Sequence, residues 1–377
     1  MKTFAEHFCL KDGRDNFFID ESRDSQLVLG SRKYKKTVDE MLDAAIASRR
    51  PPRLVWVGDF GVGKTHHINY TDNKISTEAK PFKVIRMDLP DVVDNSDFNV
   101  LFERMVGEIG LNFFKPLLVE QIQAEPKWLD TITPLDIKKA LRQLALNEDV
   151  AESAWDFLCG RKLAKDERAQ VGVSKLQLDD SEEFASVLQH IATVIRSRTP
   201  DHRVLLYLVD EVEGLGVVTR ANAANKWILA LRKILDITDI GIIFAIGSLS
   251  LNEIPTILTN GAIIRRFGNE NYVVLQPFEI NETKSFVQEL LAQFVEPNRR
   301  AAVETKEKLL AKSDYDPAFY PFMKDAFEGY CEHLIGDTAR AKPAQFQLKL
   351  HATLSAALKE DKSVIDRPFL EGRGEWQ

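Results

Sequence analysis

The residues with the clearest chemistry form a glycine-rich loop, Gly58-Asp59-Phe60-Gly61-Val62-Gly63-Lys64-Thr65. An apolar, β-rich run at residues 53–57 precedes the loop, and no helix breaker follows it for several residues, which predicts the order strand, loop, helix. Gly58 and Gly63 allow backbone N–H groups to turn toward phosphate oxygens at a helix N-terminus, where the helix dipole also favours anions. The sequence therefore predicts a phosphate-binding loop.

The end of the loop carries residues suited to a magnesium nucleotide. Lys64 is placed to reach the phosphates, and the Thr65 hydroxyl is expected to face Mg²⁺. We therefore expect residues 58–66, from Gly58 through His66, to bind ATP. Neighbouring side chains on a helix point about 100° apart, so His66 and His67 are expected to pack or contact solvent instead of sharing a metal ion.

A second apolar run, residues 204–209, ends in two carboxylates, Asp210 and Glu211. The carboxyl ends of parallel strands meet at one edge of a sheet, so this pair is expected where the phosphate loop emerges. Phosphoryl transfer needs charge neutralisation by a metal and an in-line nucleophile; we predict that Asp210 holds Mg²⁺ and Glu211 polarises the attacking water. The alternative is that the pair caps the following helix.

Three further polar residues follow predicted elements. Ser248 comes after a strand and is a candidate to hydrogen-bond the attacking water or the terminal phosphate, with an ordinary helix N-cap as the alternative. Arg265 and Arg266 end an apolar helix pattern, from which a guanidinium could reach a phosphate held by an adjacent subunit. The alternative for both arginines is a solvated helix terminus.

The elements that position these residues predict an α/β fold. Apolar runs that predict buried, central strands occupy residues 53–57, 82–87, 204–209, 242–246 and 272–275. Longer helical patterns alternate with the runs, which indicates a parallel sheet covered by helices on both faces, as in P-loop NTPases.

Helical patterns fill the rest of the chain. Before the third strand they occupy residues 98–109, 134–146, 153–158 and 181–197, and after Pro277 they occupy residues 281–295, 301–311, 320–331 and 340–358. We therefore predict a helical insertion at about residues 111–180, whose charged part, residues 161–180, is expected to contain a mobile loop. The expected domains are an N-terminal extension (1–27), a nucleotide-binding domain (28–279), an all-helical lid (280–360) and a tail (361–377).

Composition sets broad limits on function. The chain has 377 residues, a net charge of −7, 44% hydrophobic residues and 28% charged residues, which is typical of a soluble protein with two or three domains. A uniformly basic protein that coats nucleic acid is excluded, although a local basic stripe is not. The three dispersed cysteines favour neither a disulfide framework nor a zinc cluster, and neither a signal peptide nor a membrane-spanning run is expected, so we predict a cytoplasmic protein.

Together these residues resemble the AAA+ ATPases, and most closely the branch that contains origin-recognition initiators and transposon target-selection ATPases. The landmarks are Val28 to Tyr34 with the helix pattern 38–47, the glycine loop, the acidic run 210–215, Ser248, Arg265-Arg266-Phe267, residues 276–283 and Gly336-Asp337-Thr338-Ala339-Arg340. The resemblance covers roughly residues 25–358. Asp59-Phe60 replaces a proline that is common in the family's loop, and the helical insertion is not a standard family feature.

The resemblance implies an intersubunit ATPase. Residues 28–34 would pack on adenine, and Arg340 would reach the nucleotide from the lid as a second sensor. One subunit of an oligomer would supply the loop and acidic pair, and its neighbour would supply Arg265 or Arg266. Two functions remain open: an assembly that loads on DNA or recruits a DNA-processing protein, or a regulatory ATPase that gates a protein effector, for instance in anti-phage defence, without contacting DNA. No winged-helix or helix-turn-helix pattern follows the lid.

Overall fold

The computed structural model describes residues 2–20, 23–30, 32–48, 50–248, 250–336, 340 and 342–372. The chain divides into two compact units. The first, called here the sheet unit, comprises Thr37–Asp59 and Thr71–Val274. The second, called the helical unit, comprises Met1–Lys36, Phe60–Tyr70 and Leu275–Gln377.

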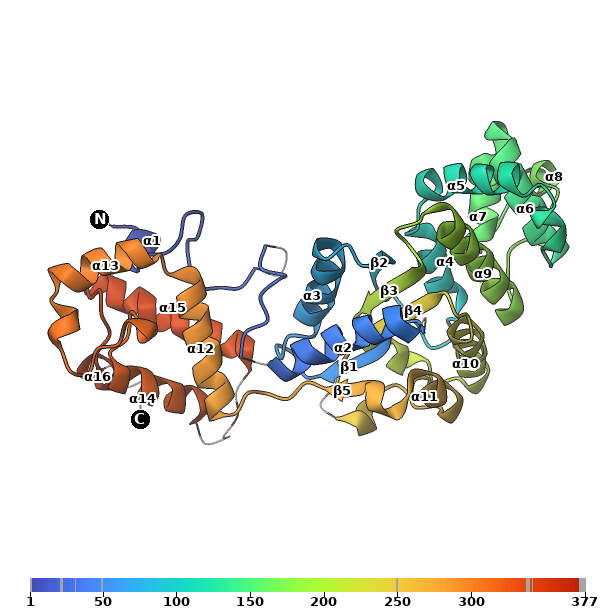
Figure 1. Cartoon of the computed structure of the whole chain (residues 1–377). Coiled ribbons are helices and arrows are strands. Elements are labelled where there is room, and N and C mark those ends of the chain that lie inside the picture. Colours follow the sequence, from blue (N-terminus) through green and yellow to red (C-terminus); the bar gives the residue numbers. More distant parts are fainter. Residues whose placement is uncertain are drawn as a thin grey trace. The chain divides into compact units, whose positions relative to one another are not determined.

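The sheet unit is built on five parallel strands in the order β2-β3-β4-β1-β5 (Figure 1). The strands are β1 (Arg53–Gly58), β2 (Phe82–Asp88), β3 (Val204–Asp210), β4 (Ile240–Gly247) and β5 (Tyr272–Val274). They coincide with the predicted runs, and the predicted parallel sheet is confirmed. Because β1 pairs with both β4 and β5, the strand that leads into the glycine loop lies inside the sheet.

The prediction that all five strands are central is wrong for β2 and β5, which form the two edges. In β2, the exposed side chains of Arg86 and Asp88 alternate with the buried side chains of Ile85 and Met87. This alternation is typical of a strand with one face in solvent. β5 is short, and all of its residues are half-buried.

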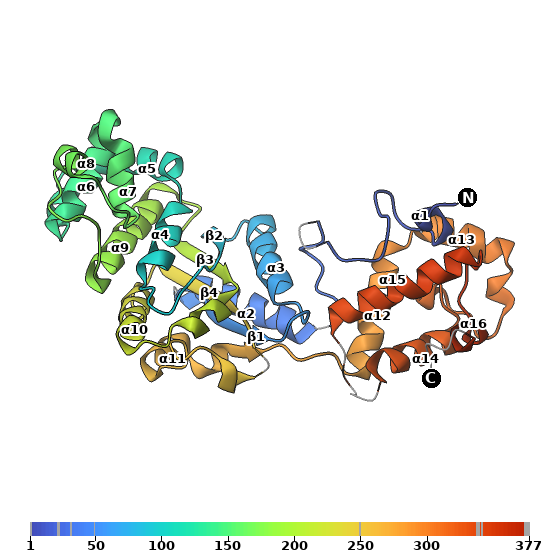
Figure 2. The same cartoon turned by 180° about the vertical axis from the view of Figure 1, so that it is seen from behind.

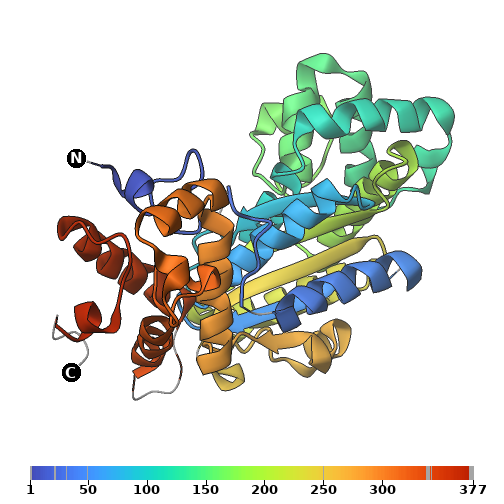
Figure 3. The same ribbon diagram turned by 60° about the vertical axis from the view of Figure 1, so that its left-hand side comes forward.

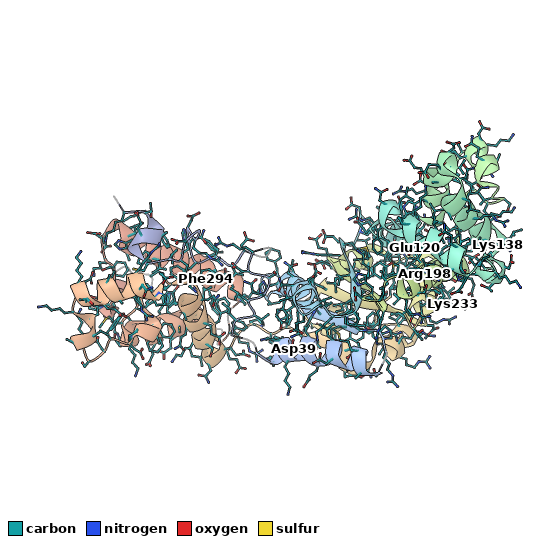
Figure 4. All side chains as sticks on the ribbon, turned by 45° about the horizontal axis from the view of Figure 1, so that its top comes forward. Asp39, Glu120, Lys138, Arg198, Lys233 and Phe294 are labelled. Carbon is teal, nitrogen blue, oxygen red and sulfur yellow. The ribbon has the colours of Figure 1, made fainter. Side chains whose placement is uncertain are left out.

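Helices cover both faces of this sheet (Figure 3). Right-handed crossovers place α9 (Ser181–Arg198), α10 (Ala221–Leu235) and α11 (Gly261–Phe267) on one face. The sheet-unit parts of α2 (Arg32–Ser48) and α3 (Lys64–Thr77) belong to the other face. There an ion pair of 3.0 Å joins Lys74 of α3 to Asp39 of α2, which is labelled in Figure 4.

The insertion between β2 and β3 is helical, as predicted. Its helices before α9 are α4 (Asn99–Gly107), α5 (Leu111–Ala124), α6 (Leu135–Leu146), α7 (Ala151–Leu158) and α8 (Lys165–Val171), and α5 to α8 lie together in both Figure 1 and Figure 2. Helix α5 was not predicted, and Pro116 lies inside it. Residues 161–180 contain α8 and the buried side chains of Leu163, Val171 and Leu178, so part of this segment is packed. Residues 172–180, between α8 and α9, are not helical, and the predicted mobile loop stays a prediction for them.

The helical unit joins the two ends of the chain. Its C-terminal helices are α12 (Ile280–Phe294), α13 (Pro297–Lys306), α14 (Lys324–Ile335), α15 (Pro343–Lys359) and α16 (Arg367–Glu371). The N-terminal residues, which include α1 (Phe4–His7), contribute Phe8 and Phe17 to the same core. The ring of Phe17 stacks on that of Phe294, with 6.2 Å between ring centroids. Residues of the predicted N-terminal extension are therefore part of the core of the helical unit.

The prediction of a C-terminal tail is wrong for residues 361–372. Phe369 and Leu370 of α16 are buried in the core of the helical unit, and Ile365 is fully buried beside them. These apolar residues lie among charged and glycine residues, which hid their helical spacing. Residues 373–377 lie outside the described part of the chain. Among the described helices, none combines the length and apolar character that crossing a membrane requires.

Candidate nucleotide site

The glycine loop connects β1 to α3, as predicted. Gly61 and Gly63 have φ angles of +80° and +99°, in the region that only glycine adopts easily. A Cβ atom on Gly61 would also lie 3.2 Å from the Cβ of Ala344 at the start of α15. The glycines that turn the backbone are therefore Gly61 and Gly63. Gly58, to which we had assigned part of this turn, is the last residue of β1 and pairs in register with Gly247.

The two histidines after the loop form hydrogen bonds with backbone carbonyl oxygens. The His67 ring is buried, and its Nδ1–H donates to the Gly63 carbonyl oxygen over 2.7 Å. Burial lowers the pKa of His67 to about 4. His66 Nε2–H donates to the carbonyl oxygen of Leu27 in the N-terminal segment. Both rings therefore make structural contacts, which agrees with the predicted packing of these side chains.

A cavity of about 290 Å³ lies within the helical unit, beside the loop. Its volume is close to the lower end of the range for small-molecule sites. It is lined by loop residues 60–67 and by Ile19, Leu27, Val28, Leu29, Tyr34, Phe278, Phe286, Pro343, Ala344 and Gln347. The wall away from the loop is mainly apolar and aromatic, so the cavity joins an apolar compartment to a row of loop amides and to Lys64.

The acidic pair lies at the carboxyl edge of the sheet. Asp210 ends β3 and is buried, and its Oδ1 accepts the Glu211 N–H over 2.9 Å. Among the described residues, this carboxylate makes no other hydrogen bond. Glu211 is exposed and has a φ angle of +57°, which is strained for a residue with a side chain. The backbone thus turns sharply after Asp210 and presents the Glu211 carboxylate to solvent.

Glu213 is a residue that the sequence interpretation missed. Its Oε2 accepts the N–H of Gly247 at the end of β4 over 2.8 Å. A Cβ atom on Gly247 would lie 2.8 Å from Glu213 Oε1, so a side chain at this position would displace the Glu213 carboxylate. The signal for Glu213 was its place in the acidic run Asp210-Glu211-Val212-Glu213, two residues after Glu211. Glu213 therefore links the turn that contains Glu211 to the end of the neighbouring strand, β4.

Ser248 also lies at this edge, where its N–H donates to the Gly58 carbonyl oxygen over 3.0 Å. Its hydroxyl group donates to the Ser250 carbonyl oxygen over 2.7 Å and accepts the Ser250 N–H over 3.3 Å. The short helical turn that follows, residues 251–253, begins after Ser250. Ser248 therefore closes a local turn, and the N-cap alternative is wrong.

The adjacent arginines of α11 have different surroundings. The Arg266 guanidinium forms two hydrogen bonds with the Asp236 carboxylate, of 2.7 and 2.8 Å, and a third with the Ala262 carbonyl oxygen. The hydrogen bonds from Arg266 hold the pKa of Asp236 below its usual value. Arg265 is exposed, and its one side-chain hydrogen bond among the described residues joins Nε to the Gly261 carbonyl oxygen over 3.3 Å. Arg266 is thus bound to Asp236, whereas the guanidinium end of Arg265 lies at the surface.

Arg340 lies in the helical unit beside the chain that enters α12. Its guanidinium donates to Gln276 Oε1 over 3.2 Å and lies 3.5 Å from Glu279 Oε1. Residues 337–339 of the predicted second-sensor motif lie outside the described part of the chain. The contact between Arg340 and residues 276–283 joins two of the landmarks that suggested the family resemblance.

Comparisons with known proteins give similarity at the level of structure. No family model matches the chain, and no curated protein matches it in sequence. Among solved structures, it is similar to Cdc6p from Pyrobaculum aerophilum, with 11% identity over 89% of this chain and 64% of that chain and a TM-score of 0.44. It is also similar to the Aeropyrum pernix ORC1 protein, solved in complex with DNA, with 10% identity over 92% of this chain and 65% of that chain and a TM-score of 0.44.

The chain is also similar to the Aeropyrum pernix ORC2 protein, solved as ADPNP–ADP complexes, with 10% identity over 93% of this chain and 69% of that chain and a TM-score of 0.47. This chain therefore spans slightly less than two thirds of the length of the Cdc6p and ORC1 chains. The parallel sheet, the glycine loop after β1 and the C-terminal helices agree with the predicted fold class. The protein has the α/β fold of a P-loop NTPase with a C-terminal all-helical domain.

Proposed function

We propose that this protein is an ATPase of the AAA+ type that hydrolyses a magnesium-bound ATP at the interface between subunits. The observation that carries the proposal is the cavity beside the loop, where an apolar compartment adjoins Lys64 and the left-handed backbone of Gly61 and Gly63. An apolar compartment suits a nucleobase, and a loop of this conformation at the N-terminus of α3 suits its phosphates.

The hydrolytic roles follow from the chemistry of the side chains. Lys64 binds the phosphates, and the Thr65 hydroxyl and the Asp210 carboxylate supply the oxygen ligands that Mg²⁺ prefers. The buried Asp210 suits this role because its carboxylate has few protein partners. When bound, Mg²⁺ neutralises charge that develops on the phosphates. Glu211 orients and deprotonates the attacking water, and Ser248 remains a candidate contact to that water. Arg340 would exchange Glu279 for a phosphate oxygen.

Arg265 is the arginine that we propose acts on a neighbouring subunit. Its guanidinium end is exposed, whereas Arg266 is bound to Asp236. Arg53 of β1 reinforces this arrangement, because it donates to the carbonyl oxygens of Arg266 and Leu235. The contacts of Arg53 and Arg266 thus fix the end of α11, and Arg265, which precedes Arg266, is exposed. The proposed oligomer would hydrolyse ATP only when assembled.

The test measures the affinity of the protein for ATP and the rate of ATP hydrolysis over a series of protein concentrations. The wild-type protein should bind ATP with Mg²⁺, and its turnover per subunit should increase with concentration. Lys64→Ala should abolish binding, because the phosphates lose their cationic partner, whereas Lys349→Ala is a matched control on the exposed side of α15. The proposal is wrong if Lys64→Ala and Lys349→Ala bind ATP equally well.

We further propose that the assembly associates with DNA or with a protein that processes DNA. This part rests on the resemblance to origin-recognition and target-selection ATPases. Binding of double-stranded DNA should be measured with and without ATP over a series of salt concentrations. A direct DNA contact should weaken steeply as salt rises, because neutralised phosphates release counterions. Binding that is absent at low salt would favour the alternative, an ATPase that gates a protein effector.

A further inference from the structure

One wall of the cavity is a short N-terminal segment, Leu27-Val28-Leu29-Gly30, called here the strap. Both ends of the strap are anchored within the helical unit. At its start, the Leu27 carbonyl oxygen accepts a hydrogen bond from His66, one turn into the phosphate-loop helix. At its end, the Gly30 N–H donates to Glu289 Oε2 of α12 over 3.0 Å. The strap therefore connects the phosphate loop to a lid helix.

The anchor at Gly30 depends on close backbone approach. Gly30 has a φ angle of +70°, and a Cβ atom at this position would lie 2.7 Å from the Cβ of Phe286 and 3.0 Å from the Glu282 carbonyl oxygen. A side chain is therefore excluded by both conformation and space. Phe286 itself lines the cavity, so the contact that holds the strap also sets the position of an aromatic wall.

The middle of the strap carries backbone groups that suit recognition of a flat base. Val28 and Leu29 are half-buried and line the cavity, and within the described part of the chain their N–H and C=O groups make no hydrogen bond. Backbone groups that a bound base would shield from water need partners, and the edge of a purine offers both donors and acceptors. The orientation of these groups depends on the two anchors, since Leu27 and Gly30 flank them directly.

We propose that Glu289 is a positioning residue for nucleotide binding: through Gly30 it holds the strap so that the Val28 and Leu29 backbone meets the edge of the base. Glu289 itself contacts neither the base nor the phosphates. This inference rests on the proposed function, and it assigns part of the affinity for ATP to a lid glutamate that lies outside the loop and outside the family landmarks. A hydrogen bond to a charged acceptor is worth enough to change affinity by about tenfold.

The experiment compares ATP with inorganic tripolyphosphate, which offers the phosphates without a base. We expect Glu289→Ala to weaken ATP binding about tenfold and to leave tripolyphosphate binding unchanged. Glu289→Gln keeps the carbonyl acceptor of the side chain and should restore most of the ATP affinity. Glu328→Ala, at an exposed glutamate of α14, is the matched control and should change neither affinity.

The outcomes separate the two proposals. If wild-type protein binds ATP and Glu289→Ala binds it equally well, the positioning role is wrong and the proposed function stands. Equal weakening of ATP and tripolyphosphate would show a general structural role and would also overturn the inference. If the wild-type protein binds neither compound, the proposed function fails, and the role of Glu289 fails with it.

Discussion

The two units of this protein build their cores in different ways. The core of the sheet unit comes from one stretch of chain, residues 55–267, in which strands and covering helices alternate. The core of the helical unit comes from both chain ends, because Phe8 and Phe17 pack in the same cluster as Phe286, Phe294 and Phe346. The first core follows local sequence order, and the second depends on contacts between residues hundreds of positions apart.

This difference separates two kinds of functional residue. In the sheet unit, Asp210 is the last residue of β3, and Glu211 and Ser248 come directly after strands, so the order of elements brings them to one edge. In the helical unit, the cavity wall is made from residues such as Leu29 and Phe286, which no local motif connects. The proposed catalytic groups therefore follow from sequence patterns, whereas the proposed base-binding wall depends on contacts between distant parts of the chain.

The largest expected effect tests the independence of the two cores. Phe17→Ala should destabilise the helical unit by about 3–5 kcal/mol, because a fully buried ring is replaced by a cavity. Phe157→Ala is the matched change in the sheet unit, where Phe157 is also fully buried. Hydrogen exchange of the backbone amides should show faster exchange mainly in the unit that carries each substitution. Uniform acceleration across both units by either variant would contradict the comparison.

The next effect concerns the acidic edge of the sheet unit. Glu211→Gln should lower ATP turnover about 10²- to 10³-fold while preserving ATP affinity, because the amide cannot accept a proton from water. Glu213→Gln keeps an acceptor for the Gly247 N–H and should reduce turnover much less. Single-turnover hydrolysis and equilibrium binding measure the two quantities separately. A larger loss in Glu213→Gln than in Glu211→Gln would reverse the roles of the two carboxylates.

The third effect separates the arginines of α11. Arg265→Ala should reduce turnover of the assembled protein at least about a hundredfold without changing its melting temperature. Arg266→Ala should lower the melting temperature by a few degrees, since α11 loses its link to Asp236. Turnover at saturating protein concentration and thermal unfolding should be measured for both variants. Unchanged turnover in Arg265→Ala would exclude it as the residue that acts on the neighbouring subunit.

The smallest effect is a pH dependence in the helical unit. His67 has a pKa of about 4 in the folded protein because it is buried, below the ordinary value of 6.5. Protonation therefore favours unfolding: the stability that neutral His67 permits is fully present above pH 6.5 and is lost as the pH falls toward 4. Melting temperatures between pH 7 and pH 4 should fall more steeply for wild type than for His67→Gln. Parallel curves would show that His67 does not set this dependence.

Local patterns were sufficient for much of the fold and of the candidate site. Each predicted strand was found, because a continuous apolar run between polar turns has few other ways to be buried. The glycine loop was identified for a similar reason: its backbone conformation can be formed only by specific residues at specific positions. The edge positions of β2 and β5 were not predictable in this way, because strand order is set by crossovers between distant elements.

The sequence by itself thus determined the parallel sheet, the glycine loop after β1 and the acidic residues at the end of β3. Only the tertiary structure decided that Glu213 contacts Gly247. It also decided that Arg266 binds Asp236 while Arg265 stays exposed, and that Glu289 holds the strap through Gly30. The physical reason is the sequence separation over which each interaction acts. Backbone conformation and burial periodicity act between near neighbours, whereas each of these contacts joins residues 30 or more positions apart and exists only when the chain is folded.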